Sequence, residues 1–167
     1  MIDDELRRSA TRVLDLCRAR GMRVVTAESC TGGLVAAALT EIAGSSDVVE
    51  GGFVTYSNAA KQATLGVPAG TLSRNGAVSS ETAAAMAAGA LKRSQGDFSV
   101  AITGIAGPGG GSKQKPVGLV YFAAASRDGR QLGRSRRFGK IGRRRVRLRS
   151  VAEALSLLEL LAKGATD

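Results

Sequence analysis

The sequence predicts an α/β protein with a mixed sheet flanked by helices. Segments with strand character alternate with segments of helical periodicity along most of the 167 residues. Late in the chain, two strand candidates flank an Asp-Gly pair, which is typical of an antiparallel hairpin. The length suits one hydrophobic core. We therefore expect a single domain over residues 1–167, with no internal repeat and no linker.

The first elements are a helix, a strand and a second helix. Apolar residues recur on one face of residues 3–20, and Gly21 follows as a stop, so this segment is expected to be an amphipathic helix. Residues 23–27 are interpreted as a short strand. A second helix, over 31–42, is expected to begin with two glycines.

The middle of the chain is expected to contain one strand and two helices. Residues 48–56 have strand character, and 58–65 favour a short helix that stops at the following glycine. Residues 68–78 carry turn-forming residues and are interpreted as a loop. Ser79 is then expected to cap an alanine-rich helix that runs to about residue 93.

The last third is expected to hold three strands and a long helix. Residues 98–103 favour a buried strand, and 119–126 and 131–138 favour two strands of the hairpin. Residues 143–161 carry leucine and valine at helical spacing, so we expect a final amphipathic helix. The stretch 113–116 is interpreted as a surface loop.

Positive charge is concentrated in one band. The net charge is +10, from 24 Lys and Arg against 14 Asp and Glu, and nine of the basic residues lie between Arg134 and Arg149. Outside this arginine band the chain has 15 basic and 14 acidic residues, so the remainder of the chain is nearly neutral. Such a band favours phosphate or nucleic-acid binding, and a plain solvated surface is the alternative. Phe138 is its one aromatic residue, which argues against single-stranded nucleic acid.

The chain contains no histidine, and this narrows the possible chemistry. A Ser-His-Asp triad, a Cys-His dyad and a His-ligated metal site within the chain are excluded. A general base must be a lysine, a carboxylate, a tyrosine or a polarised water. The two cysteines, Cys17 and Cys30, are interpreted as reduced thiols. We expect no metal and no cofactor.

The segment TAESCTGG, residues 26–33, is the first candidate for a reactive site. Ser29 lies where a strand passes into a helix, so free backbone N–H groups of Cys30, Thr31, Gly32 and Gly33 are expected to point there. Such donors could stabilise an oxyanion or bind a phosphate. The simpler alternative is that Ser29 only caps the helix.

The segment GGFVTYSNAAK, residues 51–61, is the second candidate. Tyr56 is expected to end a strand and Asn58 to begin a helix, with Lys61 about one turn later. A lysine near a helix N-terminus and other cations has a lowered pKa and could deprotonate a serine hydroxyl. A solvated surface lysine is the alternative. Ser57, four residues before Lys61, ranks second to Ser29 as nucleophile, and Cys30 ranks third.

The segment TGIAGPGGG, residues 103–111, follows a buried strand directly. A glycine-rich loop at that place is a favourable ligand site in an α/β sheet, although it lacks both the dinucleotide and the Walker patterns. A loop without a ligand is the alternative. Arg143 and Arg147, four residues apart on the last helix, could form an anion clamp.

Taken together, these segments resemble the CinA C-terminal family of nicotinamide-mononucleotide deamidases. The matching strings occur in family order over roughly residues 5–162: TAESCTGGLVAAALTEIAGSS, VVEGGFVTYSNAAKQATLGV, NGAVSSETAAAMAAGA, AITGIAGPGGGSKQKPVGLVYFA and RVRLRSVAEAL. One departure is the sequence IGRRRVR, residues 141–147, where family members often carry a Gly-Asp pair before the first arginine. The chain resembles the stand-alone form, without a large N-terminal domain.

The resemblance implies a three-layer α/β/α sandwich with a mixed five-stranded sheet. It implies hydrolysis of nicotinamide mononucleotide to nicotinic acid mononucleotide and ammonia, with Ser29 as nucleophile, Lys61 as base and Tyr56 assisting. The residues expected to bind substrate are Cys30, Thr31, Gly32, Gly33, Asn58, Thr103, Gly104, Gly107, Gly109, Gly110, Arg143 and Arg147.

Two other functions stay open at this stage. One is a non-catalytic nucleotide- or phosphate-binding module, and the other is a basic nucleic-acid-binding protein. We expect a cytoplasmic protein without membrane contact, because no apolar run approaches the roughly 20 residues of a membrane span and the N-terminus is charged. The resemblance and the small size favour a homo-oligomer.

Overall fold

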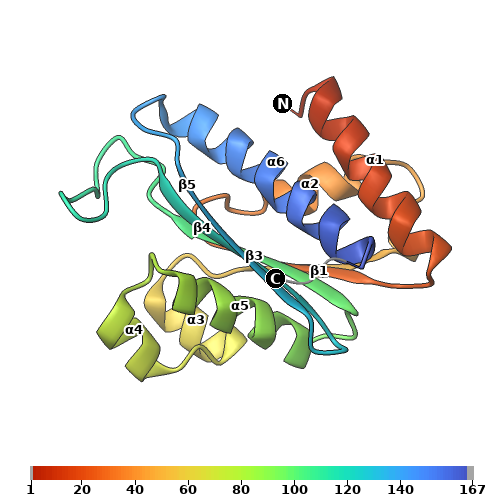
Figure 1. Ribbon diagram of the computed structural model, residues 1–167, viewed down its shortest axis with the longest axis horizontal. Helices are drawn as coiled ribbons and strands as arrows, with labels where there is room; N and C mark the ends of the chain where they lie inside the picture. The colour runs from red at the N-terminus through yellow and green to blue at the C-terminus, as the bar shows by residue number, and fades with distance from the viewer. Residues whose placement is uncertain (1, 165–167) are drawn as a thin grey trace.

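The structure, a computed structural model, describes residues 2–164. Five strands form one sheet in the order β2-β1-β3-β4-β5, with helices on both faces (Figure 1). The strands are β1 Val24–Glu28, β2 Val49–Val54, β3 Phe98–Gly104, β4 Leu119–Ser126 and β5 Gln131–Arg137. The helices are α1 Asp4–Ala19, α2 Leu34–Thr40, α3 Asn58–Leu65, α4 Ala69–Asn75, α5 Ser80–Lys92 and α6 Arg143–Ala162, with a 3₁₀ turn, η1, at Ser45–Asp47.

The sheet is mixed, as expected. β1 pairs in parallel with both β2 and β3, and the pairs β3–β4 and β4–β5 are antiparallel. The carboxyl ends of β1, β2 and β3 therefore lie at one edge of the sheet, where Glu28 is in register with Val54 and Ile102. Ligands of α/β proteins bind at such an edge, and the three candidate motifs all follow these strand ends.

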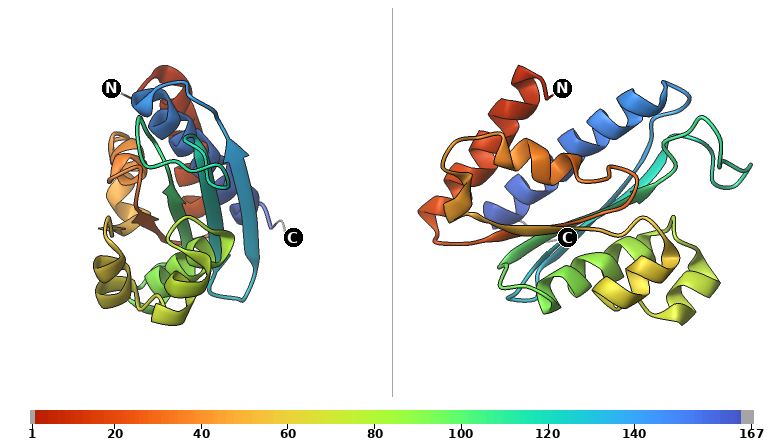
Figure 2. Two further views of the ribbon diagram at one scale, coloured as in Figure 1. Left: turned by 90° about the vertical axis from the view of Figure 1, so that its left-hand side faces the viewer. Right: turned by 180° about the vertical axis from the view of Figure 1, so that it is seen from behind.

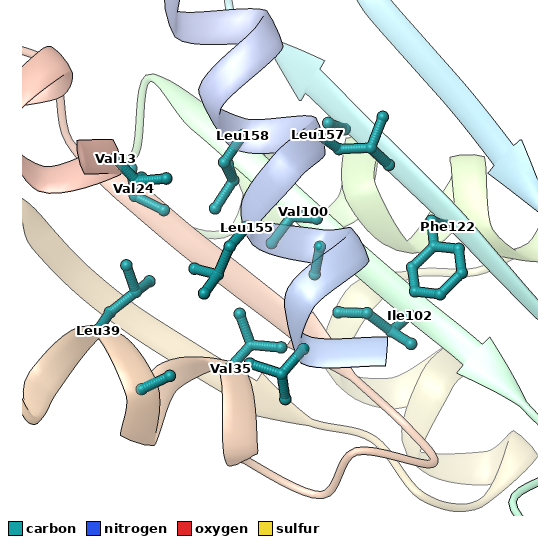
Figure 3. Packing of buried hydrophobic residues seen from close by; sticks show 14 of the residues in the cluster. Val13, Val24, Val35, Leu39, Val100, Ile102, Phe122, Leu155, Leu157 and Leu158 are labelled. Atoms are coloured by element: carbon teal, nitrogen blue, oxygen red, sulfur yellow. The ribbon is translucent and has the colours of Figure 1, made fainter. Parts of the chain in front are cut away.

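Two hydrophobic layers hold the sandwich together. The larger one lies between the sheet and the layer of α1, α2 and α6, where Leu155 and Leu158 face Val24 and Val100 (Figure 3). The smaller one lies between the other face of the sheet and α3, α4 and α5 (Figures 1 and 2). It is rich in alanine, which lets these helices approach the sheet closely.

The helix ends follow from local signals. The Asp3 carboxylate accepts a hydrogen bond from Leu6 N–H at 2.9 Å and caps α1, and Ser79 caps α5 as expected. Gly21 has φ +63°, a left-handed conformation that suits the stop after α1. The expected hairpin is confirmed, and Gly129 adopts φ +98° in its turn.

Three expected boundaries were wrong. The segment interpreted as a loop, 68–78, contains helix α4, which follows Pro68 and buries Leu72 in the smaller layer. The helix expected over 31–42 starts only at Leu34, because Gly32 and Gly33 adopt positive φ. Strand β2 ends at Val54, so Tyr56 follows the strand and does not end it.

Candidate active site

A cleft of about 260 Å³ opens at the carboxyl ends of the parallel strands. This volume is slightly below the about 300 Å³ at which small-molecule pockets begin, so it suits one ring and its attached group. Its lining consists of Ser29, Cys30, Tyr56, Lys61, Ala77, Val78, Thr103, Gly104, Ile105, Ala106, Gly107, Gly109, Gly110 and Arg143.

Ser29 stands at the base of this cleft, directly after β1. Its backbone N–H donates to Ile102 O at 2.9 Å, which ties the residue to the end of β3. The residue is 9% exposed, so it borders the cleft from a nearly buried position. The sheet thus fixes the main chain of Ser29, and its hydroxyl does not cap α2.

Lys61 reaches Ser29 from the fourth position of α3. Its Nζ lies 3.0 Å from Ser29 Oγ and donates to Thr55 O at 2.8 Å. The side chain is only 1% exposed, and this burial lowers the pKa of Lys61. The expected lowering is present, but its cause is burial rather than neighbouring cations. A neutral amine that donates to Thr55 O keeps its lone pair for the serine proton.

The two rival nucleophiles are less suited to the reaction. Ser57 caps α3, because its Oγ accepts from Ala60 N–H at 3.0 Å, and the residue is exposed. Cys30 lines the cleft, but burial raises the pKa of its thiol to about 12, which suppresses the reactive thiolate. Ser29 is therefore the best-placed of the three.

Glu28 binds three donors at the start of α2, one of which, Gly33 N–H, was expected to face Ser29. Its buried carboxylate accepts N–H bonds from Gly33 at 2.9 Å, Val35 at 3.1 Å and Ala36 at 2.9 Å. Gly32 N–H donates to Ser29 O at 3.0 Å. The expectation of four free N–H groups is therefore wrong for Gly32 and Gly33.

Two backbone donors remain available in this turn. Within residues 2–164, the N–H groups of Cys30 and Thr31 donate to no other residue. Cys30 immediately follows the candidate nucleophile, which is a common place for an oxyanion donor. Thr31 is fully buried and does not line the cleft, so the N–H group of Cys30 is the candidate for stabilising negative charge on a substrate oxygen.

Arg143 and Tyr56 form the outer wall of the cleft. Arg143 donates from Nη2 to the Tyr56 hydroxyl at 2.9 Å and from Nη1 to Gly107 O at 3.0 Å. Tyr56 is 60% exposed, so its ring stands at the mouth rather than at the base. This contact links the start of α6, the end of β2 and the glycine-rich loop.

The glycine-rich loop supplies another part of the wall. Thr103, the last residue but one of β3, donates from its hydroxyl to Ala77 O at 2.6 Å, so this side chain fixes the wall. A Cβ on Gly104 would lie 2.8 Å from Leu119 O, and one on Gly107 would lie 2.6 Å from Val117. Glycine at these two positions therefore lets the loop pack against the chain behind it.

Some expected substrate-binding residues do not line the cleft. Asn58 is exposed in the first turn of α3, and Thr31, Gly32 and Gly33 are not among the residues that line the cleft. Arg147 donates from Nε to Cys30 O at 3.2 Å and from Nη2 to Thr31 O at 2.8 Å. The guanidinium groups of Arg143 and Arg147, which were expected to form one anion clamp, thus donate to different main-chain oxygens.

The arginine band divides into paired and exposed members. Arg134 and Arg136 form salt bridges with Glu153 at 2.9 and 2.8 Å, and Arg143 and Arg147 contact the turn and the cleft. The other members are Arg137, Lys140, Arg144, Arg145 and Arg149, which are exposed. Part of the arginine band therefore stabilises the fold and is not free to bind a ligand.

Metal-binding clusters and membrane-spanning helices are absent from residues 2–164. This part of the chain holds no group of three or more His, Cys, Asp or Glu residues arranged to bind a metal ion. It also contains no helix long and apolar enough to cross a membrane.

Comparison with known proteins identifies the family. The model of the CinA C-terminal domain matches residues 6–162. The chain belongs to the CinA C-terminal domain family. A crystal structure of the competence/damage inducible protein CihA from Agrobacterium tumefaciens superposes with a TM-score of 0.95 at 52% identity, covering 98% of both chains. A CinA superfamily protein from Klebsiella pneumoniae has a TM-score of 0.90 at 37% identity, covering 96% of this chain and 99% of its own.

CinA relatives of two lengths match the chain. The nicotinamide-nucleotide amidohydrolase PncC of Escherichia coli (strain K12) is 49% identical over 158 residues, which cover 95% of each protein. A CinA-like protein of Synechococcus sp. (strain RCC307) is 52% identical over 159 residues, but the chain spans only 37% of its length. The expected three-layer fold and family are thus confirmed.

Sequence reasoning missed Glu28 and Thr55. Glu28 stabilises the start of α2, and the main-chain oxygen of Thr55 holds Lys61. An acidic residue just before a helix start is a recognisable signal for Glu28. No pattern announces Thr55, because its role depends on a main-chain oxygen.

Proposed function

We propose that the chain hydrolyses the carboxamide of nicotinamide mononucleotide to nicotinic acid mononucleotide and ammonia. The observation that carries this proposal is the 3.0 Å distance between Lys61 Nζ and Ser29 Oγ, at a nearly buried place beside an open cleft. The name of the Escherichia coli relative, a nicotinamide-nucleotide amidohydrolase of similar length, supports the substrate.

Lys61 acts as the general base of the first step. Its lowered pKa increases the neutral fraction, whose lone pair removes the proton from Ser29 Oγ. The oxygen forms a bond to the amide carbon, and the C=O electron pair moves onto its oxygen. The N–H group of Cys30, which lines the cleft, stabilises that oxyanion.

The remaining steps return the enzyme to its starting state. The oxyanion collapses, the C–N bond breaks, and the nitrogen takes the proton from Lys61 and leaves as ammonia. Water then gives a proton to Lys61 and attacks the acyl carbon. The ester bond to Ser29 breaks, its oxygen takes the proton back, and nicotinic acid mononucleotide leaves.

Arg143 and Tyr56 are proposed to bind and orient the substrate at the mouth of the cleft. The guanidinium of Arg143 lines the cleft and is exposed, which suits contact with the substrate phosphate. Tyr56, held by Arg143, orients the ring or relays a proton. The backbone of the loop at Gly107–Gly110 offers further contacts.

The first experiment follows ammonia and nicotinic acid mononucleotide together during incubation with nicotinamide mononucleotide. Ser29→Ala and Lys61→Ala should each lower kcat by more than about 10³-fold while circular dichroism shows an unchanged fold. Ser57→Asn removes the rival hydroxyl but keeps a good helix cap, and Cys30→Ala removes the rival thiol. Both are expected to retain turnover.

The outcomes separate the competing functions. Equal release of both products, lost with Ser29 or Lys61, supports the proposal. Full activity of Ser29→Ala would disprove the assigned nucleophile. Binding of the nucleotide without ammonia release would instead indicate the non-catalytic binding module.

We also propose a single amidohydrolase domain, a homo-oligomer and a cytoplasmic location. Light scattering measures the oligomeric state, and a monomer at micromolar concentration would contradict the second proposal. Limited proteolysis tests the first, because one domain should yield one resistant core. Cell fractionation tests the third.

A further inference from the structure

Arg147 reaches across from α6 to the turn that follows Ser29. Its Nε donates to Cys30 O at 3.2 Å and its Nη2 donates to Thr31 O at 2.8 Å. A Cβ built on Gly32 would lie 3.4 Å from that Nη2, so the guanidinium packs directly over the turn. The contact joins residues more than one hundred positions apart in the sequence.

These bonds determine where the free N–H groups of the turn point. In a trans peptide the C=O and N–H point in opposite directions. The bond from Arg147 to Cys30 O therefore directs Thr31 N–H away from the guanidinium. The bond from Gly32 N–H to Ser29 O does the same for Cys30 N–H. The two remaining donors of the turn are thus oriented by two separate contacts.

The charge of Arg147 acts on the same turn. Within residues 2–164, this guanidinium forms no salt bridge. Two of its donors are committed to carbonyl oxygens. A cation on a carbonyl oxygen polarises the peptide, so its N–H becomes a stronger donor. The bond to Thr31 O strengthens Gly32 N–H in this way, and the bond from Gly32 N–H to Ser29 O in turn strengthens Cys30 N–H, which lines the cleft.

We infer that Arg147 is a positioning residue that acts through Thr31 O and the Gly32 N–H bond to Ser29 O. It thereby orients and polarises the Ser29–Cys30 peptide, whose N–H at Cys30 binds the oxyanion. This role differs from the direct phosphate contact expected for Arg147 from the sequence. The inference rests on the proposed amidase reaction, in which the negative charge develops on the substrate oxygen. Its effect belongs to the transition state, whereas a phosphate contact acts equally on bound substrate.

Steady-state kinetics with two substrates distinguish the roles. We would compare nicotinamide mononucleotide with nicotinamide riboside, which carries the same amide without the phosphate. Arg147→Ala should lower kcat about 10- to 100-fold for both substrates and leave their ratio of kcat/KM unchanged. Arg147→Lys should be intermediate, because one ammonium cannot hold both carbonyls in the same geometry. Arg144→Ala, an exposed arginine on the same turn of α6, is the matched control.

If Arg147→Ala raises KM for nicotinamide mononucleotide alone and leaves kcat unchanged, the inference is overturned and Arg147 is assigned to the phosphate. Thermal unfolding of both variants shows whether the fold is kept. If Arg147→Ala does not fold, the kinetics of Arg147→Lys decide in the same way.

Labelling with diisopropyl fluorophosphate separates this inference from the proposed function. Ser29 Oγ bonds to phosphorus, fluoride leaves, and Lys61 takes the serine proton, with charge on an oxygen in the same place. Slower labelling in Arg147→Ala than in Arg144→Ala, read by intact mass, supports positioning even if the wild type releases no ammonia. Equal labelling rates would overturn it, as would a wild type that neither labels nor deamidates.

Discussion

Glu28→Gln tests whether the start of α2 depends on a buried negative charge. In the wild type, Oε1 accepts from Ala36 N–H and the Thr26 hydroxyl, and Oε2 accepts from Gly33 and Val35. The Thr26 hydroxyl can rotate to accept a bond, so the new NH₂ group fits best in the Oε1 position. Ala36 N–H then faces another donor and loses its partner.

The expected cost follows from these contacts. One buried N–H without a partner costs about 1–3 kcal/mol. Loss of the charge at a buried helix N-terminus adds about 0.3–2 kcal/mol. We therefore expect Glu28→Gln to lower the free energy of unfolding by about 2–4 kcal/mol.

Urea unfolding measures this difference. With a slope of about 2 kcal/mol per molar urea, the midpoint should fall by about 1–2 M while the slope stays the same. Glu50→Gln is the matched control, because it breaks only a surface pair with Arg23 at 3.0 Å that is worth less than about 1 kcal/mol. Equal midpoint shifts for the two variants would refute the reasoning.

Three further predictions concern stability. Because burial lowers the pKa of Lys61, the unfolded chain binds a proton on this amine more tightly than the folded chain does. The free energy of unfolding of the wild type should therefore increase as pH rises from the lowered pKa of Lys61 toward its unfolded pKa of about 10.4. Lys61→Met should lack this increase. Urea unfolding at about pH 7 and about pH 10 measures it, and parallel changes would contradict it. Gly89→Ala should lower the free energy of unfolding by about 1–3 kcal/mol, although alanine has the better helix propensity, because its Cβ would lie 2.1 Å from Leu65 O. A higher melting temperature of this variant would disprove the clash. Ser79→Ala removes the cap on Thr82 N–H and should cost about 0.5–2 kcal/mol by the same assay, with no change expected if the cap is unimportant.

Local sequence signals were sufficient for most of the fold. Apolar periodicity identified α1 and α6, since a buried stripe repeats with the helix turn. The Ser79 cap and the alanine-rich run after it identified α5. The Asp-Gly pair identified the β4–β5 hairpin. Helix α4 was missed because its seven residues bury little beyond Leu72, so its pattern is too short to detect.

The arrangement of the site required the tertiary structure. The sequence by itself selected Ser29 and Lys61 as reactive residue types and, through the absence of histidine, limited the base. It did not show that Lys61 is buried, that Glu28 occupies the helix end, or that Arg147 holds the turn. Side-chain periodicity records which face of an element is buried, whereas these contacts join main-chain atoms to side chains from distant elements. Only the packing of α3 and α6 around the ends of the parallel strands decides them.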